Sequence, residues 1–120
     1  MLGSERFELL REEYQKSFPE KEALLRSLQE ELKKTGSIQT LKSLRLEVHK
    51  LAGSAAMFGF TKIGSLCKIQ EGVLGGRIDA LAQERKEFLS LEDTREKELF
   101  SQLEFFMECI RRELRNERTS

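Results

Sequence analysis

One segment constrains the fold more than any other, because its apolar residues recur at alternating spacings of three and four. The residues that follow this spacing are Leu41, Leu44, Val48, Leu51, Ala55 and Phe58. Such spacing places apolar side chains in one continuous stripe along an α-helix, and other elements must cover the stripe. The segment therefore predicts a long helix that packs against other helices of the same domain.

Similar apolar stripes in the rest of the chain predict further helices. One is expected over residues 4–16, a second runs to about residue 34, and another begins near Thr61. The inward residues expected of this last helix are Ile63, Leu66, Ile69 and Val73. The stripe expected of the final helix consists of Leu99, Leu103, Phe106, Ile110 and Leu114.

The expected helix ends rest on capping residues. Ser17 and Glu20 are spaced as a capping box, and Pro19 is tolerated in a first helical turn. Gly36 suits a left-handed cap, and Ser37 suits the start of the next helix.

The later helix ends are expected at further glycines and short polar residues. Gly59 is expected to close the helix that carries the regular stripe. The glycines at 72, 75 and 76 predict a break or turn, with helix resuming over residues 78–88. Ser90 or Asp93 is expected to cap the last helix.

These patterns predict an all-α fold, an antiparallel four-helix bundle with an additional N-terminal helix. The chain has 120 residues, which favours a single domain over residues 1–120 with its core at about residues 18–115. A single proline and the lack of alternating strand patterns agree with this class.

The charge balance argues against several kinds of partner. The chain carries 21 basic and 21 acidic residues, so it has no general attraction to nucleic acid or to an anionic membrane.

Its longest apolar run, "AAMFGF", is far shorter than a membrane span. No signal peptide is evident, and Cys67 and Cys109 are expected to be free thiols, so a cytoplasmic location is predicted. The protein is also expected to be a monomer.

His49, the sole histidine, does not lie on the apolar stripe. On a helical wheel it sits about 130° from the centre of the stripe, so it faces outward or lies at an edge. Small residues follow it on its own face, at Ala52, Gly53 and Ala56, and basic residues precede it, at Lys42 and Arg45. Gly53 costs about 1 kcal/mol relative to alanine in a helix interior. Either another helix packs there, or the space is kept for something that is bonded to His49 or docked over it.

The sequence leaves few roles for such a histidine. A metal site needs three or four ligands at matched spacing, and no second histidine or Cys-x-x-Cys pair is present. Ser54 lies about 140° around the wheel, which is poor geometry for a serine–histidine pair. A neutral imidazole can attack phosphorus, and nearby Arg45, Lys42 or Lys50 could balance the charge of a phosphoryl group.

The segment "HKLAGSAAMFGF" resembles the signature of histidine-containing phosphotransfer (HPt) domains. "KIGSLCKIQE" is similar to the next helix of that family, and the close resemblance covers about residues 38–74. The matching positions of the signature are His49, Leu51, Ala52, Gly53, Ser54, Ala55 and Gly59.

The resemblance implies a phosphorelay protein. His49 would accept a phosphoryl group from a receiver-domain aspartate or a histidine kinase pathway, including hybrid kinases, and pass it to a response-regulator receiver. The partner would supply Mg²⁺, since the chain has no Gly-rich ATP loop and no cofactor of its own is expected. The chain would be a phosphoryl carrier rather than an autonomous enzyme. The alternative is a pseudo-HPt module that binds a receiver or kinase without carrying phosphate.

Many family members have a lysine where this chain has Ala52, so the cation that holds the phosphoryl group has to come from elsewhere. Candidates are Arg45, Lys50, Lys62 and Lys68. Gln70 or Glu71 is expected to steady the imidazole, and Gly53 is expected to leave room beside it. The surface on which the partner docks is expected to include Lys42, Leu46, Ala52, Ala56 and Met57.

Overall fold

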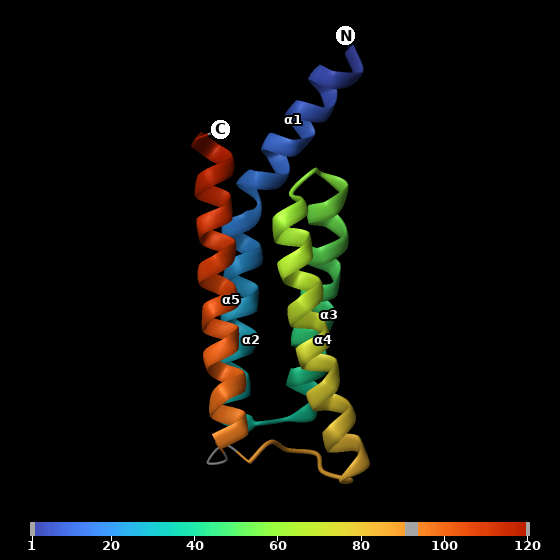
Figure 1. Cartoon of the computed structure of the whole chain (residues 1–120), viewed down its shortest axis with the longest axis vertical. Coiled ribbons are helices and arrows are strands. Elements are labelled where there is room, and N and C mark those ends of the chain that lie inside the picture. Colours follow the sequence, from blue (N-terminus) through green and yellow to red (C-terminus); the bar gives the residue numbers. More distant parts are fainter. Residues whose placement is uncertain (1, 91–93, 120) are drawn as a thin grey trace.

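The computed structural model describes residues 2–90 and 94–119, and every regular element in these two ranges is an α-helix. The prediction of an all-helical chain is confirmed. The helices are α1 (Leu2–Lys16), α2 (Phe18–Thr35), α3 (Ile38–Met57), α4 (Thr61–Gln83) and α5 (Thr94–Thr119), drawn in Figure 1.

Helices α2 to α5 lie side by side and contact one another in a ring. In this ring α2 contacts α3, α3 contacts α4, α4 contacts α5 and α5 contacts α2, and the contact between α3 and α4 is the most extensive. The molecule is elongated, 55 × 22 × 19 Å. Helix α1 leaves one end of α2 at an angle and extends past the end of the ring (Figure 1). No helix in the described ranges is both long and apolar enough to cross a membrane.

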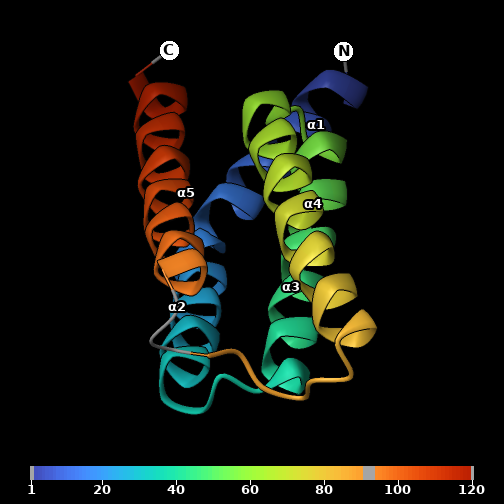
Figure 2. The same cartoon turned by 60° about the horizontal axis from the view of Figure 1, so that its bottom comes forward.

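Two connections at the other end of the ring are joined by backbone hydrogen bonds. The connection between α2 and α3 runs beside the segment that follows α4, as Figure 2 shows. The amide of Ile38 donates to the carbonyl of Glu87 at 2.8 Å, and the amide of Leu89 donates to the carbonyl of Gly36 at 2.7 Å. These bonds hold the connection between α2 and α3 against the segment that follows α4.

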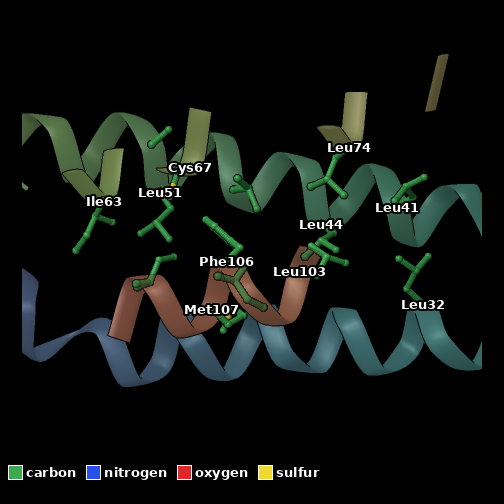
Figure 3. Packing of buried hydrophobic residues seen from close by; sticks show 14 of the residues in the cluster. Leu32, Leu41, Leu44, Leu51, Ile63, Cys67, Leu74, Leu103, Phe106 and Met107 are labelled. Atoms are coloured by element: carbon green, nitrogen blue, oxygen red, sulfur yellow. The ribbon is translucent and has the colours of Figure 1, made fainter. Parts of the chain in front are cut away.

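The core lies along the axis of the ring. Leucine side chains from several helices meet there, together with Ile63, Cys67, Phe106 and Met107 (Figure 3). Leu32, Leu41 and Leu74 have no exposed surface, and complete burial of such a side chain contributes about 1.5–3 kcal/mol. The regular stripe of the sequence therefore faces this core, as predicted.

An aromatic cluster attaches α1 to the turn after α3. The Tyr14 ring stacks on Phe58 with a centroid distance of 4.7 Å and meets Phe18 edge-on at 5.2 Å. The Tyr14 hydroxyl lies 2.6 Å from the Ser54 hydroxyl, and Arg11 Nε donates to the carbonyl of Phe58 at 3.2 Å. Because of these contacts, α1 covers the end of α3.

The caps between α2 and α3 are as predicted, but the one before α2 is not. The Ser37 hydroxyl accepts a hydrogen bond from the amide of Gln39 at 3.2 Å, and Gly36 has the left-handed φ of 63° that favours glycine. The capping box at Ser17 is wrong. Its backbone is helical, and its hydroxyl donates to the carbonyl of Tyr14 at 2.5 Å instead of capping α2.

The predicted break at the glycines of α4 is also wrong, since α4 is continuous from Thr61 to Gln83. The helix expected over residues 78–88 is therefore the end of α4, which stops at Gln83. Packing against α3 outweighs the low helix propensity of glycine here, because this is the most extensive contact in the molecule.

Two smaller predictions concern Ile69 of α4 and the caps of α5. Ile69 was expected to face inward but is 68% exposed, because the buried face of α4 runs through Cys67, Gln70 and Leu74. Of the two predicted caps of α5, Ser90 lies four residues before Thr94, where the described helix begins, and Asp93 lies outside the described residues.

A continuous α4 predicts that Gly76→Ala stabilises the protein. No atom lies within 4 Å of the position that the new Cβ would occupy, and alanine gains about 1 kcal/mol over glycine in a helix interior. Urea denaturation should show this increase in the free energy of unfolding. Gly36→Ala is the matched control, and it should lower the free energy of unfolding by about 1–2 kcal/mol because of its left-handed φ. A destabilised Gly76→Ala protein would contradict a continuous helix.

Candidate functional site

The candidate site is a contact between the lone histidine and a carboxylate of the neighbouring helix. His49 lies on α3 with its side chain 66% exposed, and Glu71 lies on α4 with its side chain 22% exposed. The distance between His49 Nδ1 and Glu71 Oε1 is 2.8 Å, a hydrogen bond. When the imidazole is neutral, its Nδ1–H donates a hydrogen bond to the Glu71 carboxylate, so Nε2 keeps a free lone pair. The exposed nitrogen is therefore the nucleophilic one.

Close packing of α3 on α4 makes this contact possible. A Cβ at Gly64 of α4 would lie only 3.4 Å from the carbonyl oxygen of Ala52 and 3.6 Å from the Ala56 Cβ. A larger residue at 64 would push the helices apart, so this glycine allows the approach that lets Glu71 reach His49. From His49 to Ala56 the contact moves seven residues forward along α3, and from Glu71 to Gly64 it moves seven residues back along α4. The residue numbers of each contact pair therefore add up to 120. The two helices therefore run antiparallel with a fixed register.

A shallow hollow lies beside the imidazole, on the side toward the N-terminus of α3. It is lined by Lys42, Arg45, Leu46, His49, Glu71 and Ile78. Helical side chains lean toward the N-terminus of their own helix, so the imidazole leans toward this hollow. Two of the lining residues are cationic, and the hollow could therefore take up an anion bonded to the exposed nitrogen of the ring.

The other predicted members of the phosphoryl environment lie in different surroundings. Gly53 is exposed, and no atom lies within 4 Å of the position of a Cβ there. Lys50 points toward Glu47 and forms an ion pair with it at 3.3 Å. It also lines a separate hollow between α2 and α3, together with Lys21 and Leu24. Lys50 is thus directed away from the hollow beside the imidazole.

The predicted docking residues are only partly exposed. Leu46 and Met57 have 51% and 71% of their surface exposed, and Lys42 and Ala56 are exposed as well. Ala52 is 4% exposed, so the expectation of a bare strip at this position is wrong. The close approach of α4 covers it. The exposed surface beside His49 therefore runs through Gly53 rather than through Ala52.

Of the two polar residues expected to meet the imidazole, Glu71 does so and Gln70 does not. Gln70 is buried, 5% exposed, and its Nε2 has no hydrogen-bond partner among the described residues. Sequence reasoning did not anticipate the role of Gly64. The available signal was spacing, because Gly64 and Glu71 are seven residues apart and share one face of a helix.

The surroundings offer little support for other chemistry. Among the described residues, no group of three His, Cys, Asp or Glu side chains could hold a metal ion. Burial raises the pKa of the Cys67 thiol to about 12, so this thiol stays protonated at neutral pH. The Ser54 hydroxyl forms a hydrogen bond with the Tyr14 hydroxyl rather than with the imidazole.

The Glu71 contact predicts which nitrogen of neutral His49 carries the proton. In the wild-type protein the proton should reside on Nδ1, and long-range ¹H–¹⁵N correlation spectra read this directly. Glu71→Ala should give a mixture of tautomers, because the acceptor is gone. Glu71→Gln should keep the wild-type tautomer, since its amide oxygen still accepts. A wild-type ring protonated mainly on Nε2 would contradict the observed hydrogen bond.

Comparison with known proteins gives one match. The family model described as "Hpt domain" matches residues 10–105, which include α2, α3, α4 and the contact between His49 and Glu71. No curated protein and no solved structure matches the chain. Because the family model covers well over half of the chain, the protein belongs to the Hpt domain family.

Proposed function

We propose that this protein is a histidine phosphotransfer protein that carries a phosphoryl group on His49 between receiver-domain aspartates. Its membership of the Hpt domain family supports a role in two-component signalling. The single observation that carries the proposal is the hydrogen bond from His49 Nδ1 to Glu71, which leaves Nε2 of a side chain that is 66% exposed free beside a basic hollow. An upstream histidine kinase or hybrid kinase would load the relay, and a response-regulator receiver would be the partner in transfer.

The transfer step requires little from this chain beyond positioning. The Nε2 lone pair attacks the phosphorus of a phosphoaspartate, a P–N bond forms, and the P–O bond breaks. The bonding electrons leave with the partner's carboxylate. The ring becomes positively charged because Nδ1 keeps its proton, and the carboxylate of Glu71 stabilises that charge. The partner supplies Mg²⁺ and the remaining charge stabilisation, and the reverse sequence passes the group to the next aspartate.

The rest of the molecule serves as a scaffold under this proposal. Helices α2 to α5 form the antiparallel four-helix bundle, and α1 covers one end of it. Residues 1–120 act as one domain with its core at about residues 18–115. The protein works as a cytoplasmic monomer, and its partners are proteins rather than nucleic acid or a membrane, in keeping with its balanced charge.

The docking surface in this proposal is the exposed face of α3 around His49. It comprises Lys42, Leu46, Gly53, Ala56 and Met57, which are all exposed. Leu46 and Met57 offer apolar contacts, and the glycine between them gives a partner close access to the imidazole. Transient complexes bury modest areas, so the few exposed residues around His49 suffice for docking.

A pseudo-HPt module that binds a receiver without phosphotransfer is the second candidate. The observation that favours it is Ala52, which replaces the lysine common in the family and is buried at 4% exposure. Against it stands the exposed Nε2, which a binding module does not need.

Transfer from a phosphorylated receiver with Mg²⁺ separates the two candidates. Wild-type protein should acquire an acid-labile, base-stable label, and His49→Gln should acquire none, because glutamine has no nucleophilic ring nitrogen. The readout is label retention after acid and base treatment, with circular dichroism to show that the variant folds. Receiver binding without any label on the wild-type protein would overturn phosphotransfer and favour the pseudo-HPt module.

Gly53→Gln should slow transfer from a receiver by about tenfold or more while the fold survives. The new side chain meets no atom of this protein within 4 Å of its Cβ, but it occupies the surface on which the partner docks. Ala23→Gln, on the exposed face of α2, is the matched control and should leave the rate unchanged. Stopped-flow transfer rates would measure both. An unaltered rate in folded Gly53→Gln would remove this face from the docking surface.

A further inference from the structure

The proposed function, on which this inference rests, requires a cation beside the phosphoryl group of His49. The position three residues after His49 holds Ala52, which is buried and carries no charge. Lys50 is engaged with Glu47 and points to another hollow. Lys62 and Lys68 of α4 are exposed, and neither is among the residues that line the hollow beside the imidazole.

The guanidinium of Arg45 packs against α4 at Gly75, and this position is called its seat below. A Cβ at Gly75 would lie 3.4 Å from both Cζ and Nε of Arg45 and 3.5 Å from its Nη2. The guanidinium therefore lies across the backbone of α4 at the point where Gly75 has no side chain. The residue numbers of this pair also add up to 120, so the seat follows the same register as the bond between His49 and Glu71.

This seat holds a charge beside the ring. Arg45 precedes His49 by one helical turn, about 6 Å along the axis, and both line the same hollow with Glu71. Because side chains on α3 lean toward its N-terminus, the phosphoryl group on His49 would meet the hollow on the Arg45 side. A guanidinium offers several donors in a planar fork, which suits the oxygens of a phosphoryl group.

Three glycines of α4 provide an internal comparison. Positions 72 and 76 are exposed, and no atom lies within 4 Å of a Cβ at either position. Gly75 alone of the three is buried, and the nearest atoms to its Cβ position belong to Arg45. The lack of a side chain at 75 therefore has a local consequence that the other two glycines do not share.

We propose that Gly75 is a positioning residue, which seats Arg45 so that its guanidinium receives the phosphoryl group of His49 on the N-terminal side of the ring. The cation of this domain is thus supplied from the turn before the histidine, and the neighbouring helix holds it in place. The hollow takes a tetrahedral oxyanion as its ligand.

A double-mutant cycle with phosphoramidate as a small phosphoryl donor tests this inference without a partner protein. The donor releases ammonia as the P–N bond to His49 forms. Arg45→Ala and Gly75→Leu should each slow labelling about fivefold, and the double variant should be no slower than Arg45→Ala alone. Arg45→Lys should recover part of the rate, because it restores the charge. Gly76→Leu is the matched control and should label like the wild-type protein, since residue 76 is exposed and no atom lies within 4 Å of a Cβ there.

A second readout separates charge placement from a loss of structure. In ³¹P spectra of the labelled protein, Arg45→Ala and Gly75→Leu should raise the second pKa of the phosphoryl group by about half a unit. The control should leave that pKa unchanged. Additive slowing in the double variant, or an unchanged phosphoryl pKa in folded Arg45→Ala, would overturn the assignment. Wild-type protein that acquires no phosphohistidine would instead overturn the proposed function itself.

Discussion

The close approach of α3 and α4 is the constraint on which the site depends. At Gly64 the two helices are near enough for a Cβ to touch the backbone of the other helix, and at Gly75 an arginine side chain lies over the missing Cβ. A wider spacing would move Glu71 away from His49 and leave the imidazole free to rotate. The cost of glycine in a helix, about 1 kcal/mol each, is therefore offset by the packing of the most extensive helix pair in the molecule.

This arrangement gives the imidazole a fixed tautomer while it remains accessible. His49 has 66% of its side chain exposed, so a partner can reach it, and its orientation comes from a residue that is mostly buried. In phosphoryl transfer most of the catalytic effect comes from positioning and from electrostatic stabilisation. Under the proposed function, a rod of helices that presents one oriented nitrogen and a basic hollow meets its half of that requirement, and a receiver domain would provide the other half.

The all-helical class and the placement of α3 were predictable, because the spacing of Leu41, Leu44 and Val48 has only one regular solution. The same wheel placed His49 outside the core, either facing outward or at an edge, and its side chain is 66% exposed. The continuity of α4 was not predictable, since glycine propensity argues for a break and only the packing partner overrides it. The contact of Glu71 with His49, and the seat of Arg45, depend on the register between two helices. A single sequence does not encode that register locally, although the shared face of Gly64, Glu71 and Gly75 is compatible with it.

The most direct test of the account is to locate the phosphorus on the ring after transfer. Protein labelled by a phosphorylated receiver, with ¹⁵N in the histidine ring, can be studied by ¹H, ¹⁵N and ³¹P correlation spectroscopy. The bond from Nδ1 to Glu71 predicts that phosphorus is coupled to Nε2 while Nδ1 keeps its proton. Phosphorus on Nδ1, or a phosphorylated residue other than His49, would contradict the account.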